Sequence, residues 1–373
     1  MLTVNYAAPV RNWLRSHFGR IGIVAFRRLQ FDALANVVLL LADGEGGTDT
    51  AHFTQVADSS ILDRIDPFAS GRDVAFNDEK WSALLLNKRQ AMAYRSGVEA
   101  FAKLEAEYGR VELGAVTGAN EYFVIGEDTR LKYGLSEEQV LRTSPPGTRH
   151  LRSLVFTSKD WNRLRDEGRH VWLFCPASED QSPAVEAYKR VGEQLEIPDR
   201  YKCQIRPQWW RPPKSASPDF FFTYMSHRFP RLVANDAGVT FLNSMHGLRL
   251  ASGTPSFVYR ALPLAMLNSL TILGCELGGR SYGGGVLKLE PREAALLPVP
   301  SLEILETFWN AIKSEWPHLD QQLSIGECDS VVNRVNEVLL RSTMRMSATQ
   351  VQLLRSACEA MRDGRLRRAR APR

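Results

Sequence analysis

The sequence reads Ile21-Gly22-Ile23-Val24-Ala25-Phe26 and, after residues 27–36, Val37-Val38-Leu39-Leu40-Leu41. Both runs are short, apolar and rich in β-branched residues, which is typical of buried strands. The glycine-rich segment 43–47 ends the second run. Residues 9–18 precede both runs with apolar side chains at helical spacing, so we expect an α/β unit of one helix and two strands. Because these elements cannot cover both faces of an open sheet, we expect them to be the last part of a larger domain.

In the rest of the chain, the predicted secondary structure changes from one region to the next. Residues 82–108 have a long helical pattern, and residues 111–300 mix short strands and helices with frequent Pro and Gly. Residues 301–362 return to helical spacing. The predicted organisation is an α/β unit (residues 1–80), a helical connector (81–110) and an irregular α+β domain (111–300). A helical segment (301–361) and a basic tail (362–373) follow.

Charge is unevenly distributed along the 373 residues. The last twelve residues hold six Arg and one Asp, whereas the other 361 residues hold 41 basic and 41 acidic side chains. Such a tail is either a solvated, unstructured end or a non-specific phosphate binder. No apolar run approaches the roughly 20 residues of a membrane-spanning helix, and no secretory signal is visible. We therefore expect a cytoplasmic protein with no membrane partner.

Most of the common sequence motifs of enzymes and metal sites are absent. The five Cys residues include no pair at the two-residue spacing of a zinc or redox motif, so we expect reduced and mostly buried thiols and no metal ligands. The sequence has no Gly-x-Ser-x-Gly and no His-Glu-x-x-His. Asp78-Glu79-Lys80 is superficially similar to a nuclease cluster, but adjacent residues do not make a metal site, and we expect a solvated helix start.

Residues 200–227 interleave cations with aromatic rings. Lys and Arg neutralise phosphates, and rings and guanidinium planes can stack on bases, so this pattern favours nucleic-acid contact. The alternative is a pair of strands with aromatic residues in the core, which we favour for residues 220–222. The candidate DNA-binding residues of this segment are Arg206, Trp210, Arg211 and Lys214.

A second candidate segment is Gly-rich. Residues 278–289 contain Gly283-Gly284-Gly285, and glycines let backbone amides approach a phosphate or a groove wall. Arg280, Tyr282 and Lys288 supply donors around this turn. The alternative is a plain turn before a strand. The segment 114–124, with Thr117 and Asn120, is interpreted as a strand, a tight turn and another strand.

Seven segments together carry a family resemblance, and they are residues 5–11, 33–42, 116–120, 201–211, 242–247, 267–269 and 279–300. In these segments the chain resembles the C-terminal half of adenine-N6-specific, S-adenosylmethionine-dependent DNA methyltransferases of restriction-modification systems. The resemblance implies an α/β remnant of a methyltransferase sheet, with a helix and two late strands. An irregular α+β target-recognition domain and C-terminal helices would follow it. It also implies double-stranded DNA as the partner.

The sequence departs from this family at the catalytic motifs. The Asn or Asp-Pro-Pro-aromatic loop is absent, and in the nearest string, Ser144-Pro145-Pro146-Gly147, the glycine cannot stack on a base swung out of the helix. The cofactor-binding strand and turn are also absent, so we expect no cofactor-binding residues and no S-adenosylmethionine on this chain alone. The resemblance implies one possible catalytic residue, Phe31, stacking on adenine, with Phe26 the less favoured choice.

We therefore expect a DNA-binding part of an adenine methyltransferase that methylates DNA only if a separately encoded N-terminal catalytic half is supplied. Two alternatives remain open. The chain is either a stand-alone DNA-specificity or interaction subunit of a restriction-modification system, or an inactive gene fragment. The recognition sequence does not follow from the residues, since base readout depends on side-chain geometry.

Overall fold

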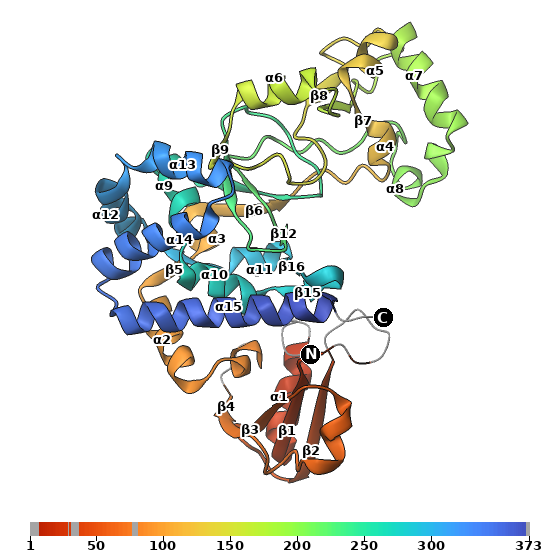
Figure 1. Cartoon of the computed structure of the whole chain (residues 1–373). Coiled ribbons are helices and arrows are strands. Elements are labelled where there is room, and N and C mark those ends of the chain that lie inside the picture. The colour runs from red at the N-terminus through yellow and green to blue at the C-terminus, as the bar shows by residue number, and fades with distance from the viewer. Residues whose placement is uncertain (1–6, 29, 31–36, 77–80, 371–373) are drawn as a thin grey trace.

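The computed structural model describes residues 7–28, 30, 37–76 and 81–370. Figure 1 shows an open C, with an N-terminal sheet unit at one end, a helical body in the middle and an outer lobe at the other end. The mixed α/β fold with small sheets and C-terminal helices is confirmed. No single described helix is long and apolar enough to cross a membrane.

The N-terminal unit contains the predicted helix and two strands, α1 (Ala8–His17), β1 (Phe18–Phe26) and β2 (Val38–Glu45). Its sheet is larger than predicted, because β3 (Thr50–Val56) and β4 (Arg72–Ala75) extend it in the order β2-β1-β3-β4. β1 runs antiparallel to β2 and parallel to β3. β3 was not predicted because polar residues alternate with apolar ones along it, so it contains no apolar run.

The long helical pattern predicted for residues 82–108 is only partly helical in the structure. The chain forms four short elements instead, which are η3 (Trp81–Leu85), α2 (Lys88–Val98), β5 (Phe101–Lys103) and α3 (Leu104–Tyr108). Asn87 begins α2 with a capping box to Gln90. A Cβ on Gly97 would lie 2.1 Å from a methyl of Leu270, so this glycine permits close packing of α2 on the helix that carries Leu270.

A five-stranded sheet crosses the body in the order β6-β14-β11-β13-β9. All neighbours are antiparallel except β13 and β9. The predicted core position of residues 220–222 is confirmed, because all three Phe rings of β11 are buried. The strands are β6 (Gly109–Leu113), β9 (Val155–Phe156), β11 (Phe220–Phe222), β13 (Leu232–Asn235) and β14 (His246–Leu250).

The outer lobe has its own hydrophobic core, which includes Trp161 and Tyr122. Its sheet has the order β7-β10-β8, with β7 (Val124–Ile125), β8 (Val140–Arg142) and β10 (Trp172–Phe174). The helices are α4 (Asn120–Phe123), α5 (Glu127–Lys132), α6 (Ser158–Asp166), α7 (Pro183–Gln194), η4 (Ile197–Asp199) and α8 (Tyr201–Gln204). The strand–turn–strand predicted for residues 114–124 is wrong, because one helical turn, α4, follows Gly118 at φ +83°.

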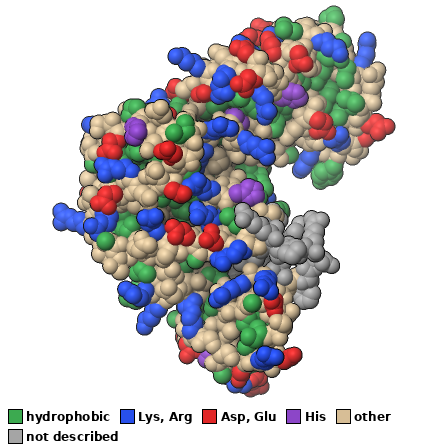
Figure 2. Space-filling model, viewed as in Figure 1, with side chains coloured by type: hydrophobic (Ala, Val, Ile, Leu, Met, Phe, Trp, Pro, Cys, Tyr) green, Lys and Arg blue, Asp and Glu red, His purple; other side chains and the backbone are tan. Residues whose placement is uncertain are grey.

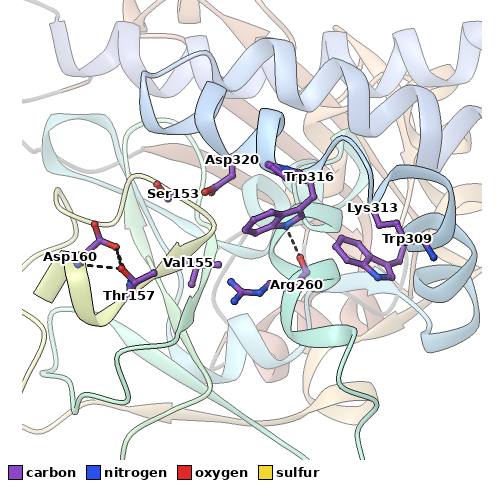
Figure 3. Close-up of a pocket in the computed structure, with 10 residues that line it drawn as sticks. Ser153, Val155, Thr157, Asp160, Arg260, Trp309, Lys313, Trp316 and Asp320 are labelled. Atoms are coloured by element: carbon purple, nitrogen blue, oxygen red, sulfur yellow. Dashed lines mark hydrogen bonds between the residues drawn. The ribbon is translucent and has the colours of Figure 1, made fainter.

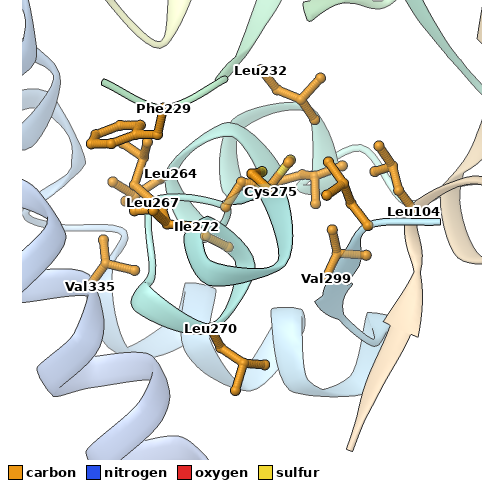
Figure 4. Packing of buried hydrophobic residues seen from close by; sticks show 14 of the residues in the cluster. Leu104, Phe229, Leu232, Leu264, Leu267, Leu270, Ile272, Cys275, Val299 and Val335 are labelled. Carbon is orange, nitrogen blue, oxygen red and sulfur yellow. The ribbon is translucent and has the colours of Figure 1, made fainter. Parts of the chain in front are cut away.

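The helical body is built around α10 (Ser269–Gly278), whose residues are buried from Ser269 to Leu277. Figure 4 shows apolar side chains surrounding this helix, among them Leu104 and Val335 from distant parts of the chain. The predicted C-terminal helices are confirmed. Other elements of the body are α9 (Val258–Ala265), α11 (Pro291–Ala295), β17 (Pro298–Pro300), α12 (Leu302–Ile312), α13 (Trp316–Ser324), α14 (Cys328–Val335), the π-helix η6 (Asn336–Thr343) and α15 (Ala348–Arg370).

A small three-stranded sheet lies on the concave side of the body, beside the C-terminal end of α15 (Figure 1). Its order is β12-β16-β15, with β12 (Met225–Ser226), β15 (Arg280–Tyr282) and β16 (Val286–Lys288). The glycine turn η5 (Gly283–Gly285) joins β15 to β16. The prediction of an unstructured tail is wrong for residues 362–370, because α15 continues to Arg370 and buries Arg365.

Candidate nucleic-acid interface

The small sheet brings together three residues predicted from the Gly-rich segment. Arg280 and Lys288 are register partners across the antiparallel pair β15–β16. The Nζ of Lys288 lies 5.0 Å from the ring centroid of Tyr282, which is within cation–π range. Tyr282 is 54% exposed, so one face of this group is open to a ligand.

Two carboxylates orient the cations of the small sheet. Arg280 makes bonds of 3.0 Å (Nε) and 2.9 Å (Nη2) to Oε1 of Glu293, which is buried. The Nζ of Lys288 lies 2.9 Å from Oε1 of Glu290. Partial burial is the largest single influence and acts to lower the pKa of Lys288. The hydrogen bond to Glu290 and the nearby charges of Glu290, Tyr224 and Tyr282 together outweigh it, so the net pKa is raised. Both cations are therefore held in place by a carboxylate, and Lys288 is charged at neutral pH.

The turn between β15 and β16 depends on glycine. Gly284 and Gly285 have φ values of +72° and +75°, in the left-handed region that favours glycine. A Cβ built on Gly284 would meet no described atom within 4 Å. The backbone therefore borders open space at Gly284, whereas Gly285 is buried.

Two stacked rings support the small sheet from inside, and the sequence analysis did not identify them as a pair. Tyr224 and His246 stack with ring centroids 4.0 Å apart. Burial lowers the pKa of His246, and its Nε2 lies 2.9 Å from the carbonyl oxygen of Leu289, so this nitrogen carries the hydrogen of the neutral ring. Tyr224 lies in the segment 200–227 and His246 in the motif 242–247, but neither pattern indicated that the two rings pair.

The other predicted group, residues 206–214, lies after α8 in the outer lobe, apart from the small sheet (Figure 1). The Nη2 of Arg206 donates to the carbonyl oxygens of Val116 and Thr117 at 2.6 and 2.7 Å, and burial lowers the pKa of Arg206. Trp210 is only 7% exposed, and the Nζ of Lys189 lies 4.8 Å from its ring centroid. The expectation of a stacking ring at the surface is therefore corrected at Trp210, whose ring packs in the core of the lobe.

The last two residues of that group are more accessible. Arg211 is half-buried, and Lys214 is exposed just beyond Pro212 and Pro213. Figure 2 shows Lys and Arg side chains along the concave side of the molecule, where the lobe meets the body. Arg211 and Lys214 thus remain available to a ligand, whereas the ring of Trp210 and the Nη2 of Arg206 are occupied by contacts within the lobe.

The residues considered for catalysis do not assemble into a described site. Phe31 and Asp78-Glu79-Lys80 lie outside the described residues. Phe26 is buried with Val24 and Val56, which is a core role. Ser144 donates or accepts a 2.7 Å hydrogen bond with Nε2 of His150, and burial lowers the pKa of His150 to about 4.

A cavity of about 580 Å³ lies between β9, α6 and the helices α9, α12 and α13. Figure 3 shows the indole of Trp316 at its centre, with its Nε1 donating to the carbonyl oxygen of Arg260 at 3.2 Å. Burial raises the pKa of Asp320, whose Oδ1 accepts from the backbone of Leu154 at 2.5 Å. None of the predicted DNA-binding residues lines this cavity. Among the described residues, no group of His, Cys, Asp and Glu side chains could hold a metal ion.

Known proteins with similar sequences show the family of this chain. Residues 78–340 match the family model of the Type II methyltransferase M.Eco57I, C-terminal domain. The chain belongs to this family. The predicted resemblance to the C-terminal part of restriction-modification methyltransferases is thereby confirmed.

Two curated relatives extend the match beyond the family model. The chain is 23% identical over 359 residues to the Type II methyltransferase M.AccI of Acinetobacter calcoaceticus, covering 91% of this chain and 64% of the relative. It is 26% identical over 319 residues to the Type II methyltransferase M.XamI of Xanthomonas campestris pv. amaranthicola, covering 82% and 56%. The chain thus spans less than two thirds of the length of either relative.

A solved structure also aligns with the chain. The type IIG restriction endonuclease BpuSI aligns with a TM-score of 0.47 and 14% identity, over 98% of this chain and 46% of that protein.

Proposed function

We propose that this chain is the DNA-binding, target-recognition part of an adenine-N6 DNA methyltransferase. The observation that carries the proposal is the group of Arg280, Tyr282 and Lys288 around a glycine turn on the concave side of a Type II methyltransferase family member. The family membership supplies the class of enzyme. The small sheet supplies a surface whose chemistry suits the DNA backbone.

Each part of this surface has a physical reason to bind DNA. Lys and Arg contacts to phosphates release condensed counterions, which gives affinity without sequence information. Arg280 and Lys288 are pre-oriented by Glu293 and Glu290, so less side-chain entropy is lost when they meet a phosphate. Tyr282 offers both a ring face and a hydroxyl to sugar, base edge or phosphate.

The glycine turn adds a close backbone approach. The space beside Gly284 is open, and a backbone without side chains can come near a groove wall. Arg211 and Lys214 of the outer lobe supply further accessible cations. We assign Arg206 and Trp210 to holding their segment in place for these two residues.

Methyl transfer requires groups that the described chain does not supply. A cavity of about 430 Å³ on the N-terminal unit is lined by Asn12, Arg15, Ser16 and residues 47–49. Its carboxylate, Asp49, is 3.0 Å from Arg15. No apolar or aromatic side chain lines it, so it does not fit the adenosyl group of S-adenosylmethionine. We therefore derive no catalytic step from these residues, and the cofactor is proposed for the complementary catalytic half.

Strand β2 offers a place for that half to join. Val38, Leu40 and Leu41 are only partly buried and Leu39 is exposed. No described strand pairs with the edge of β2 that faces away from β1. An apolar edge strand is a template for further pairing. We propose that the sheet of the catalytic half continues from this edge, so that the N-terminal unit completes a methyltransferase sheet.

The test of DNA binding is a titration of a labelled duplex with the purified chain. Non-specific binding should have a dissociation constant of about 10⁻⁴ to 10⁻⁶ M at physiological salt and should weaken steeply as salt rises from about 50 to 200 mM. Absence of salt-sensitive binding contradicts the proposal.

Adenine specificity needs a separate experiment. The chain should support methylation of adenine, with S-adenosylmethionine present, only when mixed with a polypeptide that carries the Asn-Pro-Pro-aromatic loop. Methylation of cytosine by the mixture would contradict the adenine assignment, while leaving DNA binding untouched.

A further inference from the structure

The C-terminal end of α15 lies beside the small sheet rather than in solvent alone. Residues 348–370 form one helix, and its last turns contact the glycine turn η5. Residues 362–370 hold five Arg and one Asp. Figure 1 shows this end of α15 next to β15, on the concave side. The densest cationic segment of the chain is therefore next to the proposed DNA surface.

The guanidinium of Arg365 joins the end of α15 to its neighbours. Arg365 is 2% exposed, and its Nη2 and Nε lie 2.7 and 3.3 Å from the carboxylate oxygens of Glu276. Its Nη1 donates to the carbonyl oxygens of Gly285 and His227, the latter at 3.2 Å. A single side chain thus joins α15 to α10, to the glycine turn and to the segment after β12.

The position of these contacts links Arg365 to the candidate DNA-binding residues. Glu276 lies in the last turn of α10, four residues before Arg280. Gly285 comes directly before β16, which carries Lys288. A buried guanidinium bonded to one carboxylate and several carbonyls cannot shift without breaking bonds that no water would replace. Arg365 therefore fixes the turn and the helix end relative to each other.

The neighbouring cations of the helix end are not buried in this way. Arg367 is exposed, with its Nε donating to the carbonyl oxygen of Asp363 at 3.3 Å. Arg362 is half-buried, and its Nε lies 3.8 Å from Asp363 in a loose pair. Cations at a helix C-terminus are also favoured by the helix dipole, so this end carries its charge at little cost.

We propose that Arg365 is a positioning residue that holds the basic end of α15 against the glycine turn, so that the two form one cationic surface for the phosphate backbone of duplex DNA. The inference rests on the proposed function, and it adds a second contacting element, the helix end, to the small sheet. Arg362 and Arg367 then contact phosphates, and Arg365 acts through the turn without touching DNA.

The test measures duplex affinity against salt for the full chain and three variants. Neutralising both flanking cations in Arg362→Gln/Arg367→Gln should lower the slope of log affinity against log salt by about 1.8, since each phosphate contact contributes about 0.9. The matched control is Arg355→Gln on the same helix, about 18 Å from Arg367 at 1.5 Å per residue, and it should leave the slope unchanged. Arg365→Lys keeps the charge but not the forked geometry, and its slope should fall as well.

The outcomes separate this inference from the proposed function. If the wild-type chain shows no salt-sensitive binding, the proposed function fails and the inference with it. If the wild-type chain binds and the double variant matches it, the helix end is not a contact and only the inference is overturned. A lower melting temperature for Arg365→Lys with an unchanged slope would show a purely structural role. Where Arg365→Lys does not fold, the double variant of exposed residues decides.

Discussion

Two segments of this protein have nearly the same chemistry in the sequence and opposite placements in the structure. Residues 206–214 and residues 280–288 both combine cations with aromatic rings. In the outer lobe, Trp210 and the Nη2 of Arg206 turn inward, onto lobe side chains and backbone carbonyls. On the small sheet, Tyr282 stays exposed with the Nζ of Lys288 5.0 Å from its ring centroid.

The difference shows that the direction in which the side chains point, rather than the residue composition of the segment, separates a binding surface from a packed core. Segment 206–214 follows a short helix and crosses the core of the outer lobe, so its rings meet Tyr122 and Lys189. Segment 280–288 is a hairpin at the edge of the body, and Tyr282 on it stays exposed among the described residues. Variants of the outer lobe should therefore affect stability, and variants of the small sheet should affect DNA affinity.

The largest expected effect is on the outer lobe. Trp210→Ala removes a buried indole and should lower the free energy of unfolding by about 3–5 kcal/mol, as for other large-to-small core changes. Urea denaturation followed by circular dichroism measures it. A loss below about 1 kcal/mol accompanied by weaker DNA binding would mean that Trp210 works at the surface after all.

The next effect depends on pH and also concerns the lobe. Burial lowers the pKa of His150 to about 4, whereas an unfolded chain titrates its His near 6.5. Between these values the unfolded state binds more protons, so stability is full above pH 6.5 and should fall as pH drops toward 4, by about 3 kcal/mol at most. Denaturation at several pH values tests this. The His150→Gln variant should flatten the dependence, and an equal slope in both proteins would refute the assignment.

A smaller effect is expected at the glycine turn. Gly284→Ala places a Cβ at a φ of +72°, which should cost about 1–2 kcal/mol and weaken duplex binding by displacing the turn. The matched control is Gly278→Ala, at the end of α10, where a Cβ would meet no described atom within 4 Å. Thermal melting and a duplex titration are measured together. Equal behaviour of the two variants would show that the turn does not need its left-handed backbone.

The smallest effect should be at a single cation. Lys288→Gln removes one phosphate contact and should lower the salt slope by about 0.9, with a stability change within about 1 kcal/mol because its partner Glu290 is partly exposed. The control is Lys313→Gln, an exposed lysine after α12 on the far side of the body. A slope that drops equally in both variants would mean that only net charge matters.

The sequence predicted what depends on local pattern. The strands around Ile23 and Leu40, the Phe core of β11 and the C-terminal helices follow from apolar periodicity, and the family follows from motif strings. Long-range partners were not predictable in the same way. Nothing near Arg365 in the sequence indicates Glu276, which lies 89 residues away. The inward direction of Trp210 depends on a lobe assembled from several separate segments.

Hydrogen–deuterium exchange of the full chain, with and without duplex DNA, tests the central claim most directly. The account predicts that DNA slows exchange in peptides covering residues 280–288 and the end of α15, and leaves peptides covering residues 206–210 unchanged. Protection confined to residues 206–210, or none on the small sheet while DNA is bound, would contradict it.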